Sequence, residues 1–151
     1  MNFNILEVFL SKPFLGAIIA QMSAQIIKIF IPIFRGKKPD AMNFFSYGDI
    51  PSAHTAFIVG VTFGIGLQEG WSSSIFALAV VVTSIIVYDI IKLRTAVEIN
   101  LKYTEKLMEE NKLPMDEKMP QFKGHSMFEV ATGAAWGILW VIIVFNLPIG
   151  K

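Results

Sequence analysis

The stretch SSSIFALAVVVTSIIVYDII, residues 72–91, determines the fold class of this chain. It is rich in Val and Ile, and its one charged residue, Asp89, stands near its end. A helix needs about 20 apolar residues to cross the hydrocarbon core of a bilayer. The stretch has that length, so we predict that it forms a transmembrane helix.

Three further segments have a similar character, at residues 14–34, 53–67 and 130–147, in a chain that is 54% hydrophobic. The segment 53–67 is short, but its Gly60 and Gly64 have the spacing that lets membrane helices approach closely. Pro32 is expected to kink or end the segment 14–34. We therefore predict an all-α, polytopic membrane helical bundle of about four transmembrane helices, forming a single integral membrane domain over residues 1–151.

The long polar segment lies between the third and fourth predicted spans, at residues 92–124. Its first part, residues 95–111, lacks Pro and Gly and mixes Val97, Leu101 and Leu107 with charged residues. This pattern predicts an amphipathic helix at the membrane interface. Pro114 and Pro120 then indicate a loop.

Four spans place both termini on one side of the membrane, and the 35–50 and 92–124 segments on the other. Basic residues in loops favour the cytoplasmic side. We therefore expect the two loops to be cytoplasmic and the termini to lie opposite, since the loops hold most of the basic residues, namely Arg35, Lys37, Lys38, Lys92, Arg94, Lys102, Lys106, Lys112, Lys118 and Lys123.

The charge and cysteine content exclude several functional classes. A net charge of +1 argues against bulk attraction to nucleic acid, so no nucleic-acid partner is expected. The chain has no cysteine, which excludes a disulfide framework, a thiolate metal site and a cysteine nucleophile.

Two groups of polar residues near the first two spans are candidates for binding an anion. Lys28 and Arg35 are seven residues apart, and would share one helix face as a pair of cations. The alternative is a lysine that extends to the interface beside a flanking arginine. Ser52 is a predicted N-cap, and Ala53 and His54 follow it at a helix N-terminus, where backbone N–H groups favour anions.

The ends of the later spans supply the other candidates. Asp89 and Arg94 either pair with each other or form a further phosphate contact oriented by Asp89. His125 and Glu129 have the i, i+4 spacing of neighbours on a helix, so Glu129 would fix the tautomer of His125 and raise its basicity. Alternatively, His125 and Glu129 bind a divalent metal together with Asp89.

The motifs Lys28-x6-Arg35, Pro51-Ser52-Ala53-His54 and His125-x3-Glu129 resemble the three-part signature of the type 2 phosphatidic acid phosphatase superfamily, which includes vanadium haloperoxidases. The strings PSAHTA from Pro51, YD-x4-R from Tyr88 and GHS-x2-EV from Gly124 are closest to its small divergent branch of haloperoxidase-related membrane proteins. The resemblance covers about residues 21–137. The motifs are specific in combination and weak singly.

The resemblance implies a role for each matched residue. His125 would be the nucleophile that forms a phosphohistidine, oriented by Glu129, and His54 would be the general acid. The remaining matched groups would hold the phosphoryl oxygens, namely Lys28, Arg35, Ser52 and the backbone N–H of Ala53. The chain departs from the signature at Gly36, Asp49 and Ala53, and it lacks the Ser-Arg pair of the third motif. Arg94 is the first candidate replacement for that arginine, and Lys123 is the second.

The sequence therefore favours a membrane phosphatase acting on a lipid phosphate or diphosphate, with a membrane lipid as its substrate. No cofactor is expected, although a divalent cation at Asp89, His125 and Glu129 would turn the site into a metal-assisted phosphatase. The sequence is also compatible with a non-enzymatic protein that binds anionic lipid or phosphate, and with a transporter subunit. A thin bundle of four short spans makes a homodimer one of the expected arrangements.

Overall fold

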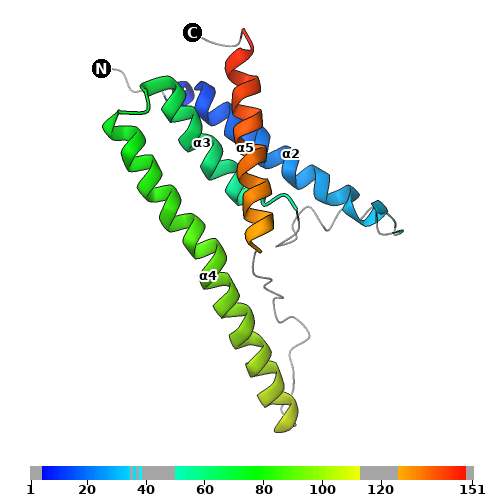
Figure 1. Cartoon of the computed structure of the whole chain (residues 1–151). Helices are drawn as coiled ribbons and strands as arrows, with labels where there is room; N and C mark the ends of the chain where they lie inside the picture. The colour runs from blue at the N-terminus through cyan, green and yellow to red at the C-terminus, as the bar shows by residue number, and fades with distance from the viewer. Residues whose placement is uncertain (1–4, 35, 37, 39–49, 113–125, 149–151) are drawn as a thin grey trace.

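The computed structural model describes residues 5–34, 36, 38, 50–112 and 126–148. The described elements are all helices, which are α1 (Ile5–Leu10), α2 (Lys12–Phe34), α3 (Ala53–Glu69), α4 (Ser74–Glu110) and α5 (Met127–Asn146). Helices α2, α3 and α5 pack together, and α4 lies against α3 on the outside of this group (Figure 1). The predicted all-α membrane bundle is confirmed.

Three of these helices, α2, α4 and α5, are long and apolar enough to cross a membrane. Helix α3 has 17 residues and is shorter, because Gly70, with a φ of 91°, ends it directly before the turn at Trp71. Figure 1 shows that α3 returns the chain to the end of the bundle at which α2 begins, and that α1 and the end of α5 lie at that end. The helices thus occupy all four predicted spans, and α3 is the short one.

Small residues bring the helix backbones of α3 and α5 into direct contact. A Cβ added at Gly133 would overlap the carbonyl oxygen of Ser52, and one added at Gly137 would overlap that of Ala56. Gly60 faces Ala17 of α2 at a similar height in the bundle. Close backbone packing of this kind replaces the hydrophobic driving force that membrane helices lack.

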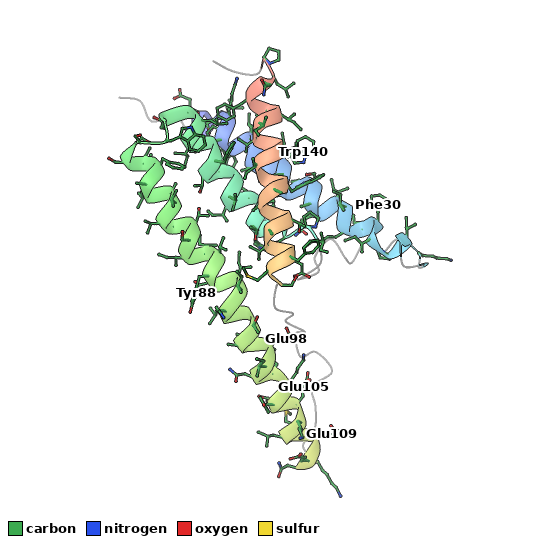
Figure 2. The ribbon with its side chains drawn as sticks, viewed as in Figure 1. Phe30, Tyr88, Glu98, Glu105, Glu109 and Trp140 are labelled. Carbon is green, nitrogen blue, oxygen red and sulfur yellow. The ribbon has the colours of Figure 1, made fainter. Side chains whose placement is uncertain are left out.

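Helix α4 differs from the prediction in one respect. The amphipathic segment is helical as expected, but it continues the third span without a break, giving one helix of 37 residues and about 55 Å. The reason is that no Pro or Gly interrupts the sequence from Ser74 to Glu110. Its polar half extends beyond the other helices and carries Glu98, Glu105 and Glu109 (Figure 2).

Helix α2 continues past Pro32, where the sequence predicted a kink or an end. The proline lies in the last turn of the helix, which runs to Phe34 and is followed by Gly36 with a φ of 71°. A left-handed glycine just past the last turn is a common way for a helix to end. The chain therefore leaves the helix a few residues later than the proline suggested.

Candidate active site

The second and third motifs meet at the start of two helices. The backbone N–H of Ser52, just before α3, donates to the carbonyl oxygen of Glu129 in the first turn of α5, at 3.1 Å. Ser52 is fully buried and Glu129 is 8% exposed. Two segments that are far apart in the sequence are therefore joined where the resemblance places the reaction.

Ser52 is the N-cap of α3, as predicted. Its Oγ accepts from the backbone N–H of Thr55 at 3.4 Å and from the Thr55 hydroxyl at 2.9 Å. Ala53 is the first residue of the helix and is fully buried, whereas His54, the second residue, is exposed. The Ala53 N–H belongs to the first turn, whose N–H groups have no acceptor within the helix.

Glu129 caps its own helix. Ser126 Oγ accepts from the Glu129 N–H at 3.2 Å, and Glu129 Oε2 accepts from the Ser126 N–H at 2.9 Å, which is a complete capping box. Ser126 is the N-cap and α5 begins at Met127. His125 lies outside the described residues, so its predicted i, i+4 relation to Glu129 stays a prediction. A carboxylate accepts about four hydrogen bonds, so Glu129 retains acceptor capacity for a further partner.

Lys28 is buried inside the bundle and is only 2% exposed. It continues the line of Ala17, Ala20 and Ala24, which are all fully buried. These residues recur at three- and four-residue intervals, so they share one face of α2. A lysine that extends to the interface would be exposed, so this alternative does not describe Lys28.

Antiparallel packing of α2 on α3 sets the height of Lys28 in the bundle. Gly64 packs on Pro13, and Gly60 packs on Ala17, so the two helices advance together in opposite directions. Eleven residues after Ala17, Lys28 lies about one turn beyond the first residue of α3. It is therefore at the level of the α3 N-terminus.

Helix α5 gives the same height independently. Trp136 Nε1 donates to Ser23 Oγ at 2.9 Å, which ties the middle of α5 to α2. These helices are also antiparallel (Figure 1), so five residues beyond Ser23 brings Lys28 to the first two turns of α5, where Glu129 lies. The buried cation and the starts of α3 and α5 thus share one level of the bundle.

Asp89 and Arg94 are both in α4, on the outside of α3. The Thr62 and Thr83 hydroxyls are hydrogen-bonded at 2.5 Å, which places these two residues at one level, and α4 runs antiparallel to α3 (Figure 1). Eleven residues beyond Thr83, the backbone of Arg94 is level with the start of α3. Asp89 is exposed, so the structure does not bring its side chain into the packed group with Ser52.

Two predicted site residues, Arg35 and His125, lie outside the described residues. Within the described part of the chain, no three His, Asp or Glu side chains are grouped so as to hold a metal ion. Because His125 is outside that part, the metal-assisted alternative stays a prediction.

Gly133, Gly137 and Thr55 were not predicted to belong to the site. The glycines allow the α3 N-terminus to lie against α5, and Thr55 fixes the Ser52 hydroxyl. The spacing of Gly133 and Gly137, with three residues between them, is the signal that would have identified this contact. Thr55 has no comparable signal, because a threonine one turn after a cap is common in any helix.

Comparison with known proteins identifies the family of this chain. The profile of the Divergent PAP2 family matches residues 9–140. YuiD of Bacillus subtilis (strain 168), described as an uncharacterized membrane protein, is 27% identical over 153 residues, which cover 92% of this chain and 97% of the relative. No solved structure matches the chain. The apolar helices and this relative support an integral membrane protein. Because the profile matches most of its length, the chain belongs to the Divergent PAP2 family.

Proposed function

We propose that this protein is a membrane phosphatase that hydrolyses a lipid phosphate or diphosphate through a phosphohistidine intermediate. The observation that carries the proposal is the hydrogen bond from the Ser52 N–H to the Glu129 carbonyl oxygen. It joins the two histidine-bearing motifs at the level of buried Lys28. Phosphoryl transfer depends mainly on clustered cations and positioned donors. The described residues supply one buried cation, Lys28, and the first-turn N–H groups of α3.

In the proposed reaction, an imidazole nitrogen of His125 forms a bond to phosphorus as the bond to the leaving oxygen breaks. His54 supplies the proton that the leaving oxygen takes up. Water then attacks the phosphohistidine and gives its proton to His54, which releases inorganic phosphate and restores His125. Lys28, Arg35, Arg94 and the Ala53 N–H stabilise the charge on the phosphoryl oxygens throughout.

The position of the site favours a lipid substrate. The starts of α3 and α5 are ends of helices in a membrane bundle, and such ends lie near the headgroup region. A phosphate on a lipid would therefore reach the site while its chains stay in the bilayer. We propose the cytoplasmic face for this end, because the segments next to it carry most of the basic residues.

Phosphate release by the purified full-length protein in lipid vesicles tests the proposal. The substrates are phosphatidate, phosphatidylglycerol phosphate and a polyprenyl diphosphate. The wild type is expected to release phosphate from at least one of them, and His125→Ala and His54→Ala to lose at least about 100-fold of the rate, in line with removal of a nucleophile or a general acid. Thr104→Ala, on the exposed part of α4, is the control.

If both histidine variants match the wild type, the mechanism is wrong. Binding of these lipids without any phosphate release would instead identify a non-enzymatic anion-binding protein. Release that depends on an added divalent cation would identify the metal-assisted route.

A further inference from the structure

Helix α4 carries one line of exposed apolar side chains along almost its whole length. In the membrane half, Tyr88 is 63% exposed, and in the polar half, Tyr103 is 65% and Leu107 is 59% exposed. Tyr88 points outward from the bundle in Figure 2. Steps of three or four residues, and one of eight residues that passes over Lys92, keep the members on one side of the helix. These members are Leu78, Val81, Ile85, Tyr88, Ala96, Ile99, Tyr103 and Leu107. We call this set the α4 stripe.

Lipid accounts for only the first half of the α4 stripe. The apolar stretch ends near Ile91, and the helix continues from Lys92 to Glu110 for about 28 Å. Ile99, Tyr103 and Leu107 are therefore apolar side chains on a charged helix outside the hydrocarbon. Burying such a side chain stabilises the state that buries it, so this half of the stripe favours a protein partner.

The surface of the polar half has the shape that a partner helix requires. A hollow of about 310 Å³ is lined by Ile99, Lys102, Tyr103 and Lys106. These four residues are at i, i+3, i+4 and i+7, which is the diamond that receives one side chain in knobs-into-holes packing. The hollow is therefore a ready-made hole of the kind found along coiled-coil helices.

The lysines around this hollow are already paired along their own helix. Lys102 Nζ lies 2.7 Å from Glu98 Oε1, and Lys106 Nζ lies 3.8 Å from Glu110 Oε1. Their charges are thus held by neighbouring carboxylates, and their aliphatic stems line the hollow. The hollow accordingly suits an apolar side chain better than an anion.

We propose that the α4 stripe is the interface of a homodimer, in which α4 of a second copy packs in parallel along it. Two copies inserted in the same membrane have the same orientation, so their α4 helices leave the bilayer on the same side. A two-fold axis along the membrane normal then brings the same stripe together from both copies. Each copy supplies the Tyr103 knob that the other copy's hollow accepts.

The area is sufficient for a specific interface. An aromatic side chain can bury about 150–250 Å². Because Tyr88 and Tyr103 are 63% and 65% exposed, the four tyrosines of two copies contribute roughly 400–600 Å² in total. The aliphatic members of the stripe bring the sum into the range of roughly 1,000 Å² or more that specific interfaces bury. The interface does not depend on the proposed phosphatase activity.

Single cysteines introduced into the full-length protein test the proposal, since the chain has none of its own. Ile99→Cys and Tyr103→Cys are on the stripe, and Thr104→Cys and Glu109→Cys are exposed positions on other sides of the same helix. Each variant is oxidised in native membranes and run on a non-reducing gel. Facing positions of a parallel pair have the separation that a disulfide needs.

The expected result is a disulfide-linked dimer for the two stripe positions, at least fivefold more abundant than for the two controls. Equal cross-linking at all four positions, no dimer at any, or linkage to a different polypeptide would overturn the proposal. A second measurement is the particle mass in nanodiscs, where Tyr103→Arg is expected to yield monomers and Thr104→Arg to keep the dimer. A wild type that is monomeric in nanodiscs would also overturn it.

Discussion

Glu129 makes structural hydrogen bonds through both its side chain and its backbone. Its carboxylate completes the capping box of α5, and its carbonyl oxygen receives the Ser52 N–H. The side chain thus has a structural function that is separate from any effect on His125. Only an effect on His125 requires the negative charge of Glu129, because a glutamine also completes a capping box.

Glu129→Gln is expected to keep the melting temperature within about 2 °C of the wild type and to reduce phosphate release at least tenfold, because the neutral amide no longer stabilises a charged His125. Thermal unfolding in detergent and the phosphate assay measure the two effects. Ser126→Ala is the matched control, since it weakens the cap by about 1 kcal/mol and leaves the charge. Full activity in Glu129→Gln would show that Glu129 serves only as a cap.

Gly133 decides whether the α3 N-terminus can lie against α5. A methyl group there would overlap the Ser52 carbonyl oxygen, which belongs to the backbone and has little freedom to move. Gly133→Ala is expected to destabilise the protein by about 1–3 kcal/mol, as overpacking does, and to reduce phosphate release. Thermal unfolding in detergent provides the measurement.

Ala135→Val is the control for Gly133→Ala, because Ala135 is exposed on the same helix. Its melting temperature is expected to match that of the wild type. A Gly133→Ala protein as stable as this control would mean that the two helices are not in backbone contact.

At the scale of the elements, the lengths of the apolar segments predicted most of the helices. They did not predict the residues at which the helices begin and end. Helix α5 begins at Met127, because the Ser126 capping box starts it earlier than the predicted residue 130. The third span and the amphipathic segment form one helix, because a change from apolar to charged residues does not break a helix without Pro or Gly. Composition thus locates a membrane segment, and local backbone chemistry sets where the helix stops.

The contact between α3 and α4 includes one hydrogen bond between hydroxyl groups, from Thr62 to Thr83. A double-mutant cycle of Thr62→Val and Thr83→Val is expected to give a coupling free energy of about 0.6 kcal/mol, the mean for such bonds in a membrane protein. Reversible unfolding in mixed micelles measures it. Ser84→Ala paired with Thr62→Val is the control, because Ser84 bonds the backbone of its own helix. A coupling free energy near zero would mean that this hydrogen bond does not hold α4 in register against α3.

The whole molecule places the starts of α3 and α5 at one end of the bundle, and α1 and the end of α5 at the other (Figure 1). The sequence predicted helices that run back and forth between these ends, whereas the site residues and the side of the membrane stay predictions. It could not give the backbone contact of Ser52 with Glu129, since that contact depends on glycines far away in the sequence.

The proposed cytoplasmic face of the bundle can be tested at the two ends of the same arrangement. Glu110→Cys, at the end of α4, is expected to react with a membrane-impermeant maleimide only in inverted vesicles, because we place this end on the cytoplasmic face. Lys12→Cys, at the other end of the bundle, is expected to react only in right-side-out vesicles. Labelling of both positions from the same side would contradict the arrangement of the helices, and a reversed pattern would contradict the assignment of the cytoplasmic face.

The most direct test of the central claim is a single-turnover reaction of the protein with phosphatidate labelled with ³²P in its phosphate group. The account predicts a transient label on the wild-type protein that is lost in acid and stable in base, as phosphohistidine is, followed by labelled inorganic phosphate. His125→Ala is predicted to show neither. Release of phosphate by His125→Ala at the wild-type rate, or release by the wild type with no labelled protein at any time, would contradict the account.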